Sequence, residues 1–118
     1  MVGLKMGDLS KNFSRSEFSC PCCGTDTIDA ELIRILQDVR DKFGPIKINS
    51  GVRCVEHNKS VGGSENSQHL KGRAADIVPL ESDLETVFRF IDENHNNTGL
   101  SLYSSFIHVD SRGRRVRW

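Results

Sequence analysis

The strongest constraint on the fold is a run of apolar side chains at helical spacing in residues 27–43. They recur at steps of three and four, as on one face of an amphipathic helix: Ile28, Leu32, Ile35, Leu36, Val39 and Phe43. Thr27 is the predicted N-cap, because acidic residues follow it in the first turn. Gly44 and Pro45 predict the end of the helix.

The rest of the chain predicts short strands and one further helix. Short apolar or alternating runs predict strands at residues 46–48, 74–78, 100–103, 106–109 and 115–118. Ser82 and Glu85 have the spacing of a capping box and predict the start of the second helix. Residues 51–68 resemble a loop, and residues 110–113 predict a hairpin between the last two strands. The expected fold is a small α+β domain in which two main helices pack on an antiparallel sheet.

The size and charge of the chain limit its organisation and its partners. A length of 118 residues predicts one domain, 1–118, with residues 1–27 as an irregular N-terminal arm. Sixteen Lys and Arg residues balance sixteen Asp and Glu residues, which argues against nucleic acid as a partner. No apolar run approaches the roughly 18–20 residues that span a bilayer, so membrane insertion is not expected. We expect a monomer, made in the cytoplasm without a signal peptide.

Three polar residues stand out because two of them interrupt apolar strands. Asp76 lies within the predicted strand 74–78, and His108 lies within the strand 106–109. A carboxylate there is costly unless a cation or a hydrogen-bond donor pairs with it. Together with His69 from the preceding loop, these side chains could bind one zinc ion with three ligands and an open position. A histidine buried in the core, and an ion pair of Asp76 with Arg53 or Arg73, are the ordinary alternatives.

The residues around His69, Asp76 and His108 identify a protein family more specifically than the spacing of these three residues does. Residues 67–76 match the pattern Ser-x-His-x-x-Gly-x-Ala-x-Asp, residues 106–110 read Phe-Ile-His-Val-Asp, and residues 50–53 read Ser-Gly-Val-Arg. In wording and order these segments resemble the zinc D-Ala-D-Ala carboxypeptidase family, which shares its fold with the hedgehog signalling domain. The resemblance covers nearly the whole chain, from about residue 12 to residue 118.

The resemblance implies a site and a reaction. Zinc would be held by His69, Asp76 and His108, and a zinc-bound water would attack a peptide bond next to D-Ala in peptidoglycan stem peptides or cross-links. Arg53 would bind the developing oxyanion or a terminal carboxylate of the substrate, although it could instead be an ion-pair partner of Asp76 or Glu56. Ser67 would orient a metal ligand through a hydrogen bond.

The general base is the point at which the chain departs from this family. Several relatives have Glu or His a few residues before the last zinc ligand, whereas residues 102–105 here read Leu-Tyr-Ser-Ser. Asp110 is the nearest candidate for the base or for a partner of His108, and Tyr103 for an oxyanion donor. Alternatively, Asp110 only opens a hairpin and Tyr103 only packs on the rim of the sheet. An inactive zinc-binding module of the same fold is therefore a second hypothesis.

The four cysteines allow three interpretations. Cys20, Cys22, Cys23 and Cys54 could hold a second, structural zinc, form a disulfide from the arm to Cys54, or remain buried thiols. A small zinc-ribbon adaptor for nucleic acid built on these cysteines is a third hypothesis, which zero net charge disfavours. For the peptidase, the resemblance suggests a phage lysin released to the cell wall by a phage lysis system, or a protein carried in a phage particle.

Overall fold

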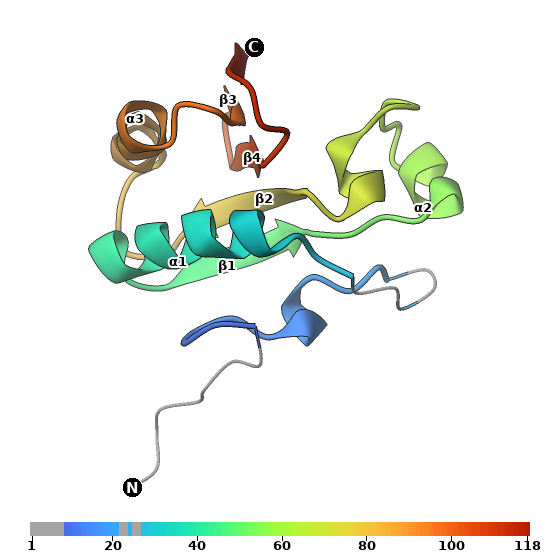
Figure 1. Ribbon diagram of the computed structural model, residues 1–118, viewed down its shortest axis with the longest axis horizontal. Helices are drawn as coiled ribbons and strands as arrows, with labels where there is room; N and C mark the ends of the chain where they lie inside the picture. The colour runs from blue at the N-terminus through green and yellow to red at the C-terminus, as the bar shows by residue number, and fades with distance from the viewer. Residues whose placement is uncertain (1–8, 22–23, 25–26) are drawn as a thin grey trace, which may run out of the picture.

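The computed structural model describes residues 9–21, 24 and 27–118. Its elements follow in the order η1 (Arg15–Glu17), α1 (Ala30–Phe43), β1 (Ile46–Ser50), α2 (Val55–Ser60), η2 (Gln68–Lys71), β2 (Ala74–Pro79), α3 (Leu84–Asn94), β3 (Gly99–Leu102), β4 (Ile107–Asp110) and β5 (Val116–Arg117). The strands form one sheet in the order β1-β2-β4-β3-β5, shown in Figure 1 with α1 across β1 and β2. The predicted α+β class with a mainly antiparallel sheet is confirmed.

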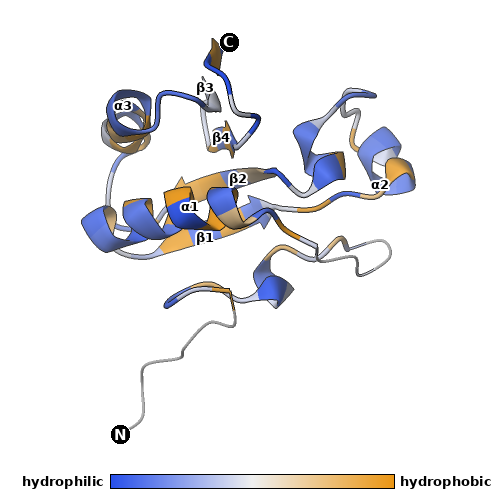
Figure 2. Cartoon of the chain, in the orientation of Figure 1, coloured by the Kyte–Doolittle hydropathy of each residue, from blue (hydrophilic) through white to orange (hydrophobic). Residues whose placement is uncertain are grey.

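The sheet separates an apolar face from a polar one because side chains alternate along each strand. Ile77 in β2, Ile107 in β4 and Leu100 in β3 lie fully buried in the core, together with apolar residues of α1 and α3. Figure 2 shows the matching concentration of hydrophobic residues in β1, β2 and β4. Asp76 and His108 occupy the alternate positions of their strands. The helices therefore pack against one face, and the opposite face is left for polar side chains.

Both main helices form where the periodicity predicts them, but each begins later than expected. The N-cap of α1 is Asp29 rather than Thr27. Tertiary contacts fix this start, because the Asp29 amide donates to the Gly72 carbonyl (2.8 Å) and its carboxylate accepts from the Ser111 hydroxyl (2.7 Å). The N-cap of α3 is Asp83 rather than Ser82, since the Asp83 carboxylate accepts both the amide and the hydroxyl of Thr86.

Two further local predictions were wrong. Residues 51–68 are not all loop, because Cys54 caps the short helix α2 by accepting the His57 amide on its sulfur at 3.4 Å. The last two strands do not form a hairpin with each other. Instead β5 pairs in parallel with β3, while β3 and β4 form the antiparallel pair.

The N-terminal arm contributes to the core despite its irregular backbone. Phe13 and Phe18 are fully buried, and their rings lie 6.0 Å apart. The Phe18 carbonyl accepts the Val52 amide at 2.8 Å. The arm is thereby attached to the segment that follows β1 and leads towards the polar face of the sheet.

Candidate metal centre

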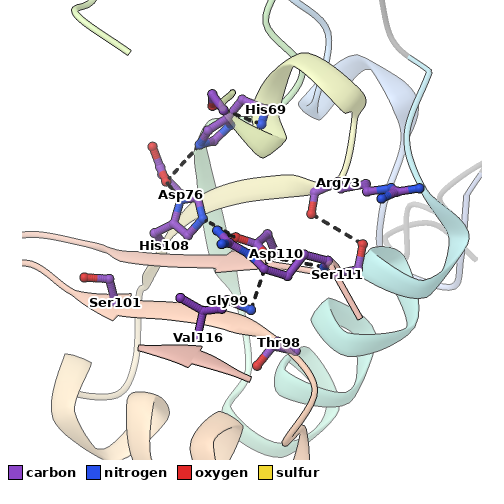
Figure 3. A network of polar contacts seen from close by, with 12 residues as sticks. His69, Arg73, Asp76, Thr98, Gly99, Ser101, His108, Asp110, Ser111 and Val116 are labelled. Carbon is purple, nitrogen blue, oxygen red and sulfur yellow. Dashed lines mark hydrogen bonds and ion pairs between the residues drawn. The ribbon is translucent and has the colours of Figure 1, made fainter. Parts of the chain in front are cut away.

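His69, Asp76 and His108 meet on the polar face of the sheet. Asp76 and His108 are directly opposite each other in the antiparallel pair of β2 and β4. His69 reaches them from η2, as Figure 3 shows. Asp76 Oδ1 lies 3.3 Å from His69 Nε2 and 3.1 Å from His108 Nδ1. In the described part of the chain, these three make the one cluster of His, Cys, Asp or Glu able to hold a metal.

A tight turn delivers His69 to this position. Gly72 ends η2 in the left-handed region at φ 67°, where side chains are strained. A Cβ at Gly72 would also lie 2.2 Å from the Thr27 carbonyl oxygen. The turn therefore requires glycine at position 72. Ser67 acts on the backbone of this turn, because its hydroxyl accepts the His69 amide at 3.2 Å.

The outer nitrogen of each histidine ring is already hydrogen-bonded. His69 Nδ1 lies 2.7 Å from the Gly51 carbonyl oxygen, which can only accept a hydrogen bond, so Nδ1 carries the proton. His108 Nε2 lies 2.8 Å from Asp110 Oδ2 and donates to that carboxylate. With those protons in place, His69 Nε2 and His108 Nδ1 both face Asp76, and each can bind a metal once it has no proton of its own. Such outer partners are what orient histidine ligands around a metal.

The arrangement fits zinc. Two imidazole nitrogens and one carboxylate oxygen are donors that zinc prefers, and bonds of about 2.0–2.1 Å place tetrahedral ligand atoms about 3.4 Å apart. The distances of 3.1 and 3.3 Å around Asp76 Oδ1 are close to that value. Three converging acceptors would repel one another without a cation or a proton between them. His69, Asp76 and His108 would hold the metal and leave its fourth position open to the cleft.

The buried charges at the site stabilise one another. Burial raises the pKa of Asp76, but the hydrogen bonds and charges of His108 and His69 outweigh it and lower that pKa well below its usual range. Burial lowers the pKa of His108, but Asp110 and Asp76 outweigh it and raise that pKa above its usual value. Without metal, the two carboxylates therefore favour the protonated, cationic form of His108.

Asp110 is fully buried and does not line the cleft. Its carboxylate accepts the amides of Gly99 (3.1 Å) and Arg112 (3.2 Å), besides His108. The Arg112 guanidinium adds two parallel hydrogen bonds of 2.8 and 2.7 Å. Burial raises the pKa of Asp110, but Arg112 and His108 lower it well below its usual range. The carboxylate therefore faces His108 and not the solvent.

Arg53 lies beside the cluster and is paired with it. Its guanidinium donates to Asp76 Oδ2 at 3.3 Å, to Asn58 Oδ1 at 3.2 Å and to the Ser50 hydroxyl at 3.1 Å. The ion pair with Asp76 is thus present. Arg53 also lines the cleft, so the pairing leaves it next to the space where a substrate would lie.

A cleft of about 560 Å³ opens over the three candidate ligands. Arg53 and residues 61–64 and 66–68 line one part of it, and three aromatic residues, Tyr103, Phe106 and Trp118, form its aromatic side. The Tyr103 hydroxyl oxygen accepts the indole N–H of Trp118 at 3.0 Å, which leaves the Tyr103 O–H able to donate. Sequence reasoning missed the contribution of Arg112 and Trp118 to this site.

The cysteines are only partly described. Cys22 and Cys23 lie outside the described residues, whereas Cys20 is buried and its sulfur accepts the Cys54 amide at 3.4 Å. The arm and the segment after Arg53 therefore meet at these two cysteines. A second zinc on the cysteines has no support from the described residues and stays a prediction.

Comparisons with known proteins agree with the site. Residues 11–110 match the model of the peptidase M15 family. The chain is also 48% identical over 44 residues to the zinc D-Ala-D-Ala carboxypeptidase of Streptomyces albus G. That match covers 36% of this chain and 17% of the length of the Streptomyces protein. The family match spans both histidines and the aspartate of the cluster and confirms the resemblance noted in the sequence: the chain belongs to the peptidase M15 family.

Proposed function

We propose that the protein is a zinc-dependent peptidase that hydrolyses a peptide bond next to D-Ala in peptidoglycan stem peptides or cross-links. The observation that carries this proposal is the convergence of His69, Asp76 and His108 at the floor of an open cleft. The D-Ala preference is taken from the name of the Streptomyces relative. None of the helices in the described part of the chain is long and apolar enough to cross a membrane. The phage routes to the cell wall remain predictions.

The side chains around the cleft have separable roles. Zinc bound there would polarise the scissile carbonyl and lower the pKa of a water molecule towards about 7. Arg53, held by Asn58 and Ser50, offers a fixed guanidinium to the oxyanion or to a terminal carboxylate of the substrate. The Tyr103 O–H can donate to the same oxyanion. Asp110 is buried, so we assign it to the orientation of His108 rather than to proton transfer with the substrate.

One observation favours a second candidate function. In the described part of the chain, the cleft is lined by no carboxylate or imidazole apart from the three candidate ligands. A general base besides the ligands is therefore not in place among those residues. This favours an inactive zinc-binding module that recognises cell-wall peptides without cleaving them.

Digestion of purified peptidoglycan, and of a stem peptide ending in D-Ala-D-Ala, tests both candidates. Fragments are identified by mass for the native protein, the chelated protein, His108→Ala and the control His95→Gln, whose histidine lies outside the cleft. Release of D-Ala or of stem-peptide fragments should require zinc and His108 but not His95. The fragment masses also distinguish a carboxypeptidase from an endopeptidase. Stoichiometric zinc without any product would contradict the peptidase and support the inactive module.

A further inference from the structure

The Arg112 side chain connects the candidate metal centre to the aromatic side of the cleft. One edge of its guanidinium forms two parallel hydrogen bonds with Asp110, which holds His108. Its Cζ atom lies 5.3 Å from the centre of the Trp118 ring, in a cation–π contact. Arg112 therefore touches a partner of a metal ligand and a cleft-lining aromatic at the same time.

The pairing of Arg112 with Asp110 is built into the sheet. A Cβ at Gly99 in β3 would lie 2.3 Å from Asp110 Oδ2 and 2.6 Å from Arg112 Nε. Only glycine leaves room for the two side chains to lie flat over the β3 backbone. The Gly99 amide also donates to Asp110. The backbone of β3 is thus shaped around this ion pair.

Trp118 lies beside the candidate metal centre and lines the cleft. Its ring centre lies 5.0 Å from that of His108, and its indole N–H donates to Tyr103. Its carbonyl accepts the Ser101 hydroxyl at 2.8 Å. The residue is nevertheless 55% exposed, and it lines the cleft. Trp118 is therefore available to contact a substrate peptide in the cleft.

We propose that Arg112 is a positioning residue that orients two parts of the site. Through Asp110 it fixes the ring of His108, and through Trp118 it fixes the aromatic side of the cleft that receives the peptide. The effect on His108 rests on the proposed zinc site, whereas the effect on Trp118 can be measured without metal. Lysine cannot substitute, because an ammonium group offers neither the two parallel hydrogen bonds nor a flat surface for the indole.

The first test measures zinc affinity by competition with a chromophoric chelator. The variants are Arg112→Gln, Arg112→Lys and the control Arg114→Gln, an exposed arginine of the same segment. We expect zinc affinity to fall about tenfold in Arg112→Gln, in line with losses of outer-shell partners. Arg112→Lys should stay several-fold below the native protein, and Arg114→Gln should match it. Thermal unfolding of each metal-free variant shows whether it is folded.

The second test uses Trp118 as its own probe, because it is the single tryptophan of the chain. Acrylamide quenching of its fluorescence is measured in the metal-free protein. Quenching should increase in Arg112→Gln, and in Arg112→Lys, but not in Arg114→Gln. A stem peptide added to the zinc-loaded native protein should protect the indole from acrylamide, and this protection should be weaker in Arg112→Gln.

The outcomes separate this proposal from the proposed function. If the native protein binds no zinc, the zinc site fails while the quenching comparison still tests Arg112. If Arg112→Gln is folded and both its zinc affinity and its quenching stay within twofold of the native values, the positioning role is wrong. Full recovery of zinc affinity by Arg112→Lys would show that charge alone acts, which would also overturn the proposal.

Discussion

His108 is the residue at which metal binding and protonation compete. Asp110 and Asp76 raise its pKa, which favours a metal-free ring with a proton on each nitrogen. A metal at Nδ1 must displace one of those protons, whereas the proton on Nε2 stays in the hydrogen bond to Asp110. The same carboxylates that organise the ligand therefore make its binding sensitive to pH.

Zinc affinity should fall as the pH decreases through the pKa of His108. Because that pKa is raised above the ordinary histidine value of about 6.5, the fall should begin above pH 6.5 and reach about tenfold for each pH unit below the pKa. Chelator competition between pH 5.5 and 8.5 measures it. In Asp110→Asn the pKa of His108 should be lower, so the decline should start at a more acidic pH. An affinity that is constant over this range would contradict the competition.

Gly99 gives a second test at the scale of single residues. Gly99→Ala would press a methyl group against the Asp110 carboxylate and the Arg112 guanidinium. We expect unfolding free energy to fall by about 1–3 kcal/mol, as for other overpacked sites. Denaturant titration of the metal-free protein measures the loss, and zinc affinity should fall with it. A fully stable Gly99→Ala would mean that β3 can move away from the ion pair.

The sequence was informative about the candidate ligands and less so about what surrounds them. His69, Asp76 and His108 stood out because a motif placed them, and because two of them interrupt apolar strands. Arg112 and Trp118 carried no such signal. Their contacts depend on the sheet register and on the path of the chain after β4, which local sequence patterns do not encode.

At the scale of elements, the N-terminal arm supports the candidate metal centre through the backbone segment that follows β1. Phe18 is fully buried, and its carbonyl accepts the Val52 amide. The neighbouring Gly51 carbonyl accepts the proton on His69 Nδ1. The arm thus positions the backbone segment that orients one candidate ligand, although no residue of η1 reaches the cleft.

Removal of the Phe18 ring should lower both the stability of the protein and its affinity for zinc. Phe18→Ala is expected to lower the unfolding free energy by about 3–5 kcal/mol, the usual cost of removing a buried phenylalanine ring. Zinc affinity should also decrease, because the Gly51 carbonyl loses its support. Ser16→Ala, at an exposed position of η1, the short helix that Phe18 caps, is the matched control. Unchanged zinc affinity in a folded Phe18→Ala protein would separate the arm from the site.

The last strand shows where local patterns fail. Residues 115–118 have the alternation of a strand, and a hairpin with β4 was the simplest expectation from a short intervening turn. Instead β5 lies parallel to β3, at an edge of the sheet. Long-range ion pairs help to decide this: Asp92 in α3 accepts from Arg117 at 2.7 Å and from Arg115 at 2.9 Å. Such partners cannot be identified from the terminal residues alone.

Asp92→Asn should loosen β5 with only a small effect on overall stability. Hydrogen bonds from Arg117, with the charges of Arg115 and Arg117, lower the pKa of Asp92. A lowered pKa means that this stabilisation is present above the ordinary aspartate pKa of about 3.9 and is lost as the pH falls below it. At pH 7 the substitution should cost less than about 1 kcal/mol, since the pair is partly exposed. Acrylamide quenching of Trp118 should increase at pH 7, and the difference between Asp92→Asn and the native protein should narrow as the pH falls below about 3.9.

At the scale of the whole molecule, one sheet serves two purposes. Its apolar face forms the core with α1 and α3, and its opposite face carries the candidate ligands at the alternate positions of β2 and β4. The polar cluster therefore sits on the most buried strands of the fold. The strand pairing places Asp76 and His108 side by side, and a bound metal should in turn stabilise the folded state.

Zinc removal should lower the thermal stability of the whole domain. A ligand that binds only the folded chain stabilises it by about 2.7 kcal/mol at a free concentration 100 times its dissociation constant. Calorimetry with and without a chelator should therefore show a lower melting temperature for the chelated protein. In His108→Ala the chelator should have a much smaller effect. Equal melting temperatures for the loaded and chelated native protein would contradict a zinc site of useful affinity.

The direct pairing of Asp76 with His108 across β2 and β4 has a consequence for the accuracy of folding. Successive side chains of a strand point to opposite faces, so slippage of either strand by one residue would send one of the two ligands into the core. The misaligned sheet would bury a charge and lose the ion at once. Metal binding would therefore stabilise the native register of β2 and β4 relative to registers shifted by one residue, and so select for correct strand alignment.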